Sequence, residues 1–98
     1  MPQYNPPIRD MQFLLHEVLD AVPTLQALPQ HADIDADTLN AVLAEGGKFA
    51  AEVVTPINLP GDAEGCHLDK TAHAVTAPKG FKQAYAQYVE GGWPALSC

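Results

Sequence analysis

The chain has 98 residues, of which 47% are hydrophobic and 17% charged, a composition typical of a small globular protein rather than a disordered one. Its 12 acidic and 5 basic residues give a net charge of −7, and the bases are scattered, which argues against a nucleic-acid-binding surface. No apolar run approaches the roughly 20 residues of a membrane span, and the N-terminus lacks the features of a signal peptide. We therefore expect a cytoplasmic protein whose two cysteines are reduced.

The first predicted helix follows a proline-rich extended arm. It is expected to begin at Asp10, a natural N-cap, and to end at Pro23, which cannot continue a helix. Phe13 widens its apolar face. The residues expected on its solvent side are Gln12, His16, Glu17 and Asp20. The apolar face comprises Met11, Leu14, Leu15, Val18, Leu19 and Val22.

The longest helix is predicted to follow the acid-rich stretch HADIDADT, with Asp35 or Asp37 as its cap. Its apolar stripe keeps helical spacing and passes through Gly46 in phase. We therefore expect the helix to run unbroken through Gly46–Gly47, with another helix approaching the glycines closely. The stripe comprises Leu39, Val42, Leu43, Gly46, Phe49, Ala50, Val53, Val54 and Ile57.

The stretch TPINLPGDAEGC, residues 55–66, interrupts this pattern. Pro56 and Pro60 are expected to end the long helix, and the two glycines to supply turn conformations, which makes the stretch a structural connector. Residues 58–80 have no helical rhythm, and the short runs HLDK and AVT within them predict a hairpin.

A last helix is predicted from PKGFKQAYAQYVEGGWP. Gly91–Gly92 should end it, and Trp93 should be partly buried against it or against the N-terminal helix. Its apolar face comprises Phe81, Ala84, Tyr85, Tyr88 and Val89. The predicted fold is all-α, a small bundle of three to four helices with an irregular loop or short hairpin near residues 58–80.

Two clusters of reactive side chains fail as sites. Cys66, His67 and His73 lie close in sequence, but structural zinc needs four ligands at defined spacing, and only Cys98 could complete the set. Cys66 and His67 also have the residue types of a nucleophile and base. Adjacent residues on an extended chain point to opposite faces, however, and Ser97 is the only serine.

The acidic cluster Asp33, Asp35 and Asp37 lacks the glycine and glutamate of a calcium loop, so helix capping explains it better. The run DTLN faintly resembles the Asp-Ser-Leu of acyl carrier proteins, but Thr38 stands where the prosthetic arm requires serine. We therefore predict no catalytic, cofactor-binding or metal-binding residue in this chain.

Three ordered blocks resemble the N-terminal region of the long bacterial acyl-CoA dehydrogenases: YNPPIRDMQFLLHEVL, FAAEVVTPINLPGDAEGC and APKGFKQAYAQYVEGGWPALS. That family typically reads Y-x-A-P-x-R-D-M-x-F, then A-P-x-N-x-x-G-D-x-x-G-C, then P-x-G-F-x-x-A-Y-x-x-F/Y-x-x-x-G-W. The departures are Pro6, where the family often has alanine, and Thr55 before Pro56. By this resemblance residues 1–34 form an N-terminal extension with the first helix, and residues 35–98 begin the N-terminal helical domain.

The resemblance implies a longer, FAD-dependent parent enzyme of fatty acid metabolism and β-oxidation that dehydrogenates an acyl-CoA thioester between its α and β carbons. A glutamate removes the α-proton, FAD takes the β-hydride, and electron-transfer flavoprotein accepts the electrons. These groups belong to later domains, so this chain is expected to be inactive alone, to pack against those domains and to join a homo-oligomer. The alternative is a stand-alone acidic helical module that binds other proteins and has no enzymatic activity.

Overall fold

The structure is a computed structural model that describes residues 3–97, with the side chain of Ser97 excepted. The chain divides into two compact units, Met1–Ala51 and Glu52–Cys98, and each is described by itself. Among the described residues, no helix combines the length and the apolar character that a bilayer crossing requires. Helices dominate both units, and the only strands in the described part are two short ones, which confirms the predicted helical fold.

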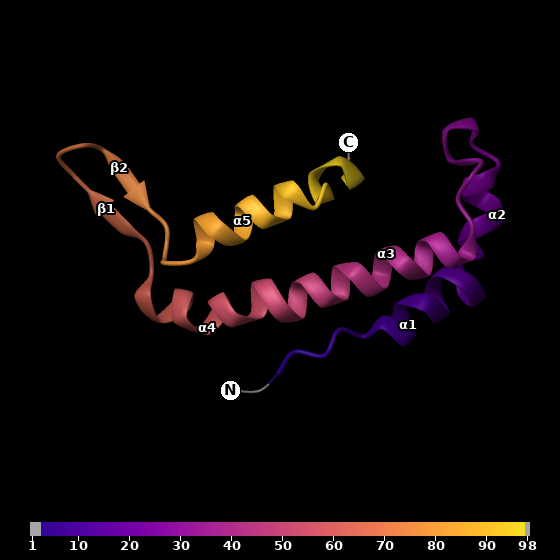
Figure 1. The fold of residues 1–98 in the computed structure, drawn as a ribbon, viewed down its shortest axis with the longest axis horizontal. Coiled ribbons are helices and arrows are strands. Elements are labelled where there is room, and N and C mark those ends of the chain that lie inside the picture. The colour runs from indigo at the N-terminus through magenta and orange to yellow at the C-terminus, as the bar shows by residue number, and fades with distance from the viewer. Residues whose placement is uncertain (1–2, 98) are drawn as a thin grey trace. The chain divides into compact units, whose positions relative to one another are not determined.

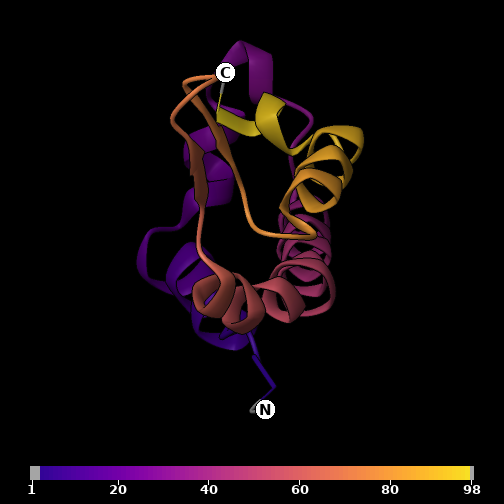
Figure 2. The same ribbon diagram turned by 90° about the vertical axis from the view of Figure 1, so that its left-hand side faces the viewer.

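The first unit consists of helical segments, and α1 runs beside α3 in the opposite direction (Figures 1 and 2). The segment α1 continues directly into a π-helical turn, η1, and short α2 and 3-10 segments lead from there to α3. The bounds are α1 Ile8–Phe13, η1 Leu14–Val18, α2 Ala21–Gln26, η2 Pro29–His31 and α3 Ala36–Phe49.

The first helix differs from its prediction at both ends. It begins before Asp10, which lies in its first turn. Its C-terminal turn is wide, because the Leu19 N–H donates to the Leu14 carbonyl at 2.8 Å, five residues back. Asp20, with φ of 49°, then turns the chain. The prediction that Pro23 ends this helix is wrong: Pro23 lies in the first turn of α2, where helical N–H groups have no partner to lose.

The face of α1–η1 that meets α3 is also not the predicted one. Gln12 and His16, both expected in solvent, are half-buried together with Met11 and Leu15. The His16 Nε2 lies 2.7 Å from the Asn40 Oδ1 on α3, which fixes this side of the helix against its neighbour. The large apolar side chains that remain exposed are Phe13, Leu14, Val18 and Leu19.

The N-terminus of α3 is capped as predicted. The Asp35 carboxylate accepts hydrogen bonds from the Thr38 backbone N–H and from the Thr38 hydroxyl, both at 2.8 Å. These bonds satisfy one of the free N–H groups of the first turn and orient the carboxylate toward the positive end of the helix dipole. Of the two expected caps, Asp35 is therefore the one used.

The long helix passes through Gly46–Gly47 without a break, as predicted. A side chain at Gly47 would have its Cβ 2.9 Å from Ile8 Cδ1 and 3.3 Å from Pro6 Cγ. The close approach thus comes from the proline-rich arm and the first residue of α1. The predicted stripe of α3 and its continuation is half-buried throughout except at Val54, so here the amphipathic pattern identifies the correct face.

The prediction that prolines end the long helix at the connector is wrong. A π-helical turn, η3 Ala50–Val54, follows α3, and α4 then runs over Thr55–Glu64 with Pro60 inside it. Pro56 has no N–H to donate and its ring crowds the carbonyl one turn back, and a wide turn immediately before it relieves that conflict. The helix ends only at Gly65, whose φ of 71° does supply a turn, whereas Gly61 is helical.

The predicted hairpin is confirmed as β1 His67–Asp69 and β2 Ala74–Thr76, paired antiparallel with Leu68 opposite Val75. Asp69 shapes its loop, because the carboxylate accepts from the backbone N–H of Thr71 at 2.9 Å and of Ala72 at 3.2 Å. All six strand residues are exposed.

The last helix is confirmed as α5 Phe81–Glu90, followed at Gly91 by its cap and then by a 3-10 segment, η4 Trp93–Ser97. Trp93 is half-buried, as expected. Its indole Nε1 lies 3.0 Å from the position that a Cβ on Gly91 would take, so the ring packs back on the end of α5.

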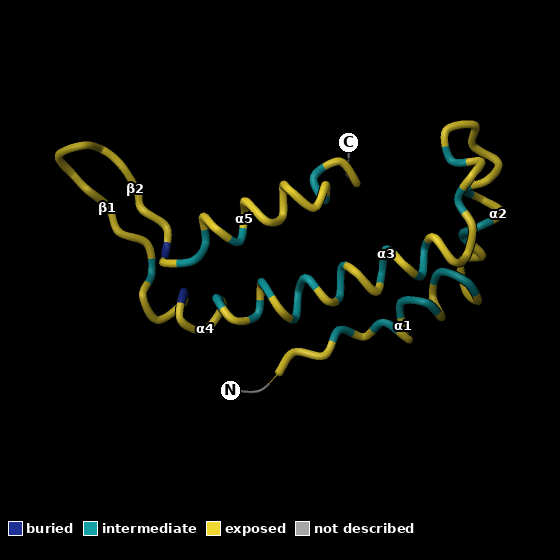
Figure 3. Tube along the Cα trace, viewed as in Figure 1, coloured by how far each residue is buried: buried dark blue, intermediate teal, exposed yellow. Residues whose placement is uncertain are grey.

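Very little of the described chain is buried (Figure 3). No hydrophobic side chain among these residues reaches full burial, and Gly61 and Pro78 are the two buried positions. Large apolar side chains on α1–η1, the hairpin and α5 remain in solvent. Uncovered apolar faces of this kind usually mark sites of interaction.

Candidate functional site

The cysteine and histidine side chains considered as possible sites in the sequence do not form a metal-binding cluster among the described residues. Cys66 is an exposed free thiol between α4 and β1, and His73 lies in the hairpin loop with φ of 54°. Within the described residues no three His, Cys, Asp or Glu side chains gather in a way that could hold a metal ion. Cys98 and the side chain of Ser97 lie outside the described part.

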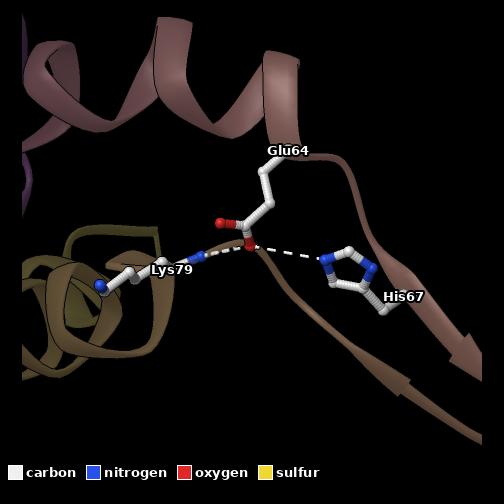
Figure 4. Close-up of polar contacts among 3 residues, drawn as sticks. All are labelled: Glu64, His67 and Lys79. Carbon is white, nitrogen blue, oxygen red and sulfur yellow. Dashed lines mark hydrogen bonds and ion pairs between the residues drawn. The ribbon is translucent and has the colours of Figure 1, made fainter.

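Glu64, in the last turn of α4, is the polar side chain that joins α4 to the residues before α5 (Figure 4). Its Oε2 accepts a hydrogen bond from the backbone N–H of Lys79 at 2.9 Å and lies 3.7 Å from the Nε2 of His67. Gly65 makes this possible, because its positive φ turns the chain out of α4 into β1, and β2 then returns it to Lys79.

The two contacts of Glu64 differ in strength. The bond from Lys79 is charge-assisted and joins residues 15 apart in sequence, at the point where α5 begins. The contact with His67 is an ion pair only when the imidazole is protonated, and its side chains are 63% and 37% exposed, so solvent screens it. Glu64 therefore acts mainly as an acceptor that holds the chain entering α5.

Close backbone packing supports the same junction. A Cβ on Gly61 would lie 2.5 Å from Phe81 Cε1, so the first ring of α5 rests directly on the backbone of α4. A Cβ on Gly80 would lie 3.1 Å from Ile57 Cγ2, and Gly80 has a φ of 92° that a side chain would strain. Two glycines and one carboxylate thus fix α4, the hairpin and α5 to one another.

This junction holds secondary-structure elements in place and contains no arrangement of nucleophile, base and acceptor. Sequence reasoning missed it, because it assigned Gly61 to a turn and gave Glu64 no role. The sequence offered one signal, because Gly61 lies near the predicted end of the long helix and Phe81 near the predicted start of the last helix. Nothing in the sequence, however, indicates that a hairpin closes them together.

The acidic cluster near α3 also has a structural role in the described fold. Two hydrogen bonds from Thr38 lower the pKa of Asp35, because they stabilise the ionised carboxylate. The Thr38 hydroxyl is engaged in one of these bonds. Asp35 therefore caps α3, as expected from the sequence.

Known proteins with similar sequences give a consistent result. No protein-family model matches the chain. Over 94 residues, 96% of the chain, it is 38% identical to the 3-methylmercaptopropionyl-CoA dehydrogenase of Ruegeria pomeroyi. Over 93 residues, 95% of the chain, it is 32% identical to the broad-specificity linear acyl-CoA dehydrogenase of Mycobacterium tuberculosis. These alignments cover 16% and 15% of the two relatives, so the chain spans about a sixth of their length.

Proposed function

This chain belongs to the acyl-CoA dehydrogenase family along at least 95% of its length, and from that premise we propose that it forms the N-terminal helical part of a longer enzyme of this kind. The parent would be a cytoplasmic, FAD-dependent enzyme that dehydrogenates an acyl-CoA thioester. The 98 residues themselves would be structural and not catalytic. The observation that carries the proposal is an alignment that covers nearly all of this chain but only 15–16% of its relatives.

The residues of this chain do not fit a flavin. A flavin site needs a concave pocket with a few convergent polar groups. The described residues bury no polar or charged side chain, and the Glu64 carboxylate already accepts a hydrogen bond from a backbone N–H. We therefore assign FAD, the proton-abstracting glutamate and the contact with electron-transfer flavoprotein to the parts of the parent outside this chain.

In this proposal the chain contributes positioned helices. In the first unit, the contact of Ile8 with Gly47 holds α1 on α3. In the second unit, the contact of Phe81 with Gly61 holds α5 on α4. The uncovered apolar side chains of both units would then be contact surfaces for the remaining domains of the same polypeptide and for other subunits.

Two preparations test the proposal: the 98-residue chain and the product of the complete reading frame. Flavin absorbance and acyl-CoA-dependent reduction of a dye are measured on each. We expect the complete protein to be yellow and active and the short chain to be colourless and inert. Flavin or turnover in the short chain would refute the structural role, and a colourless, inert complete protein would refute the parent activity.

The second candidate is a stand-alone acidic interaction module, favoured by the net charge of −7 and by the exposed apolar faces. The reading frame separates the two. A frame that encodes a β-domain and a helical bundle after Cys98 supports the enzyme, and a stop codon directly after Cys98 supports the module.

A further inference from the structure

The hairpin of the second unit has two open edges. Among the described residues β1 and β2 are the only strands and they pair with each other, so one edge of each has no strand beside it. The first unit does not supply one, because its residues 8–49 are helical segments and their links, and Pro6 holds its extended arm at Gly47. A strand edge presents N–H and C=O groups that a further strand can pair with, and a hairpin of two strands is only marginally stable alone. A further strand at one of these edges would therefore stabilise the hairpin.

The residues of β1 are complementary to a second copy of the same strand. Successive side chains of a strand alternate between its faces, so His67 and Asp69 share one face and Leu68 lies on the other. When two β1 strands pair antiparallel about Leu68, His67 of each copy lies opposite Asp69 of the other, and the two Leu68 side chains lie side by side. The pairing thus forms two imidazole–carboxylate pairs and one apolar pair, related by a two-fold axis that closes the contact after two copies.

The polar atoms for these pairs are available in the hairpin. Among the described residues, both hydrogen bonds to the Asp69 carboxylate, from Thr71 and Ala72, end on Oδ1, which leaves Oδ2 for the facing imidazole. The His67 Nε2 lies 3.7 Å from the Glu64 carboxylate, which leaves Nδ1 for the facing carboxylate. Neither contact within one copy has to be given up for the pairing.

The edge of β2 lacks this complementarity. Its residues Ala74, Val75 and Thr76 carry no charge, and Pro78, two residues further on, has no N–H to donate. Pairing β1 of one copy with β2 of another is a head-to-tail contact, which repeats without closing. Of these pairings, only β1 with β1 combines matched polar pairs with closure.

We propose that the edge of β1 binds the β1 edge of a second copy of this chain, so that the two hairpins form one four-stranded antiparallel sheet across a two-fold axis. Strands of three residues bury too little surface for a stable dimer by themselves, which takes about 1,200–2,000 Å². The pairing therefore sets the register between two copies and is weak alone. It goes beyond the proposed function, because it holds whether the chain begins an enzyme or is a stand-alone module.

Equilibrium disulfide cross-linking tests this proposal in the product of the complete reading frame. Leu68→Cys probes the two-fold axis. Val75→Cys, opposite it on β2 and similarly exposed (66% against 62%), is the matched control. Both variants also carry Cys66→Ser and Cys98→Ser. In a glutathione buffer we expect Leu68→Cys to form at least about tenfold more disulfide between copies than Val75→Cys, because the pairing holds the two thiols opposite each other within disulfide distance. Peptide mass spectrometry identifies the linked residues.

Charge variants of His67 give a second readout in the Leu68→Cys background. His67→Lys keeps an opposite charge against Asp69 of the other copy and should keep or raise the yield of disulfide. His67→Asp places two acids opposite each other on both sides of the axis and should lower the yield about threefold to tenfold. Adding Asp69→Asn should restore it, because the repulsion between copies is removed while the asparagine oxygen still accepts from the loop. A loss caused by Glu64 within one copy would not be restored.

Equal yields from Leu68→Cys and Val75→Cys would overturn the proposal, and a higher yield from Val75→Cys would overturn it in favour of the β2 edge. An unchanged yield in His67→Asp would also overturn it. If the strand variants fail to fold, Lys70→Cys with Cys66 retained repeats the test, because positions 66 and 70 of different copies lie opposite each other in the same register. Flavin content and turnover of the same samples test the proposed function separately: an active enzyme without the cross-link refutes only the pairing, and an inactive protein with the cross-link refutes only the enzyme.

Discussion

Two helices that pack on each other in the first unit, α1–η1 and α3, obey the amphipathic rule in opposite ways. In α3 the apolar stripe read from the sequence is the half-buried side. In α1–η1 the half-buried side includes Gln12 and His16, while Phe13 and Leu14 are in solvent. The pattern was equally clear in both segments, so the difference lies in their partners.

A helical hydrophobic stripe records the sum of all contacts that a helix makes, whatever chain or domain supplies them. The stripe of α3 is matched by contacts within the described residues. The stripe of α1–η1 is not, and the residues left to face α3 include a hydrogen-bonded pair, His16 and Asn40. Agreement between stripe and burial therefore distinguishes a helix whose partner is local from one whose partner lies elsewhere.

The largest expected loss of stability comes from substituting Gly47, where α1 packs on α3. Gly47→Leu should destabilise the packing of α1 on α3 by about 1–3 kcal/mol, because its side chain overlaps Ile8 and Pro6. Gly47→Ala is the control: its Cβ meets the flexible end of Ile8 at 2.9 Å and the Pro6 ring at 3.3 Å, and alanine gains about 1 kcal/mol of helix propensity that offsets the small shifts needed, so it should be close to neutral. Thermal unfolding followed by circular dichroism measures both, and equal losses would show that the close approach is not the cause.

A pair of neighbouring leucines sharpens the comparison. Leu15→Glu should cost about 1–2 kcal/mol in the 98-residue chain, because it places a charge on the half-buried side. Leu14→Glu should change stability by less than about 0.5 kcal/mol there, since that side chain is in solvent. Urea unfolding of the two variants gives the comparison. The reverse order would mean that the stripe, and not the observed side, faces α3.

The hydrogen bond between His16 and Asn40 should contribute less to the free energy of unfolding than the packing at Gly47. A double-mutant cycle with His16→Ala and Asn40→Ala should give a coupling energy of about 0.5–1.5 kcal/mol, the usual net value of one hydrogen bond. The pair Thr24→Ala and Gln26→Ala, in α2 of the same unit, is the control and should show additive effects. A coupling near zero for the first pair would show that this bond does not hold Gln12 and His16 on the side of α1–η1 that faces α3.

The smallest effect is expected at the cap of α3. Because the folded-state pKa of Asp35 is lowered, its contribution to stability is present above the unfolded pKa and is lost as the pH falls through the folded value. Asp35→Ala should remove this pH dependence and Asp35→Asn should keep part of the capping without it. Amide hydrogen exchange at Thr38, measured across the acidic range, is the readout. An unchanged profile in Asp35→Ala would assign the titration to another group.

Sequence patterns predicted helices best where the cause was local. The Asp35 cap, the continuity at Gly46–Gly47, the hairpin and the end of α5 at Gly91 all follow from neighbouring residues. The errors arose at prolines. Pro23 and Pro56 were read as helix ends. Pro23 lies in the first turn of α2, where a proline sacrifices no hydrogen bond, and Pro56 directly follows a wide turn that relieves its conflict with the preceding residues.

The junction at Glu64 could not be predicted for a different reason. Its bond to Lys79 spans 15 residues and depends on how a hairpin of two three-residue strands returns the chain, which no periodicity encodes. Gly61 looked like a turn residue beside Pro60, yet it serves as the flat surface for Phe81. The role of a glycine as a packing surface becomes visible only when the side chain that lies on it is known.

The two π turns have a consequence for how sequences of this kind diverge in length. A π turn contains one residue more than the α turn it replaces. Loss of a single residue from Leu14–Val18 or Ala50–Val54 would therefore restore ordinary helix and leave the bonding on either side intact. The same deletion in the middle of α3 would rotate every later side chain by about 100° relative to its neighbours. One-residue gaps between homologous chains should accordingly gather at these two turns.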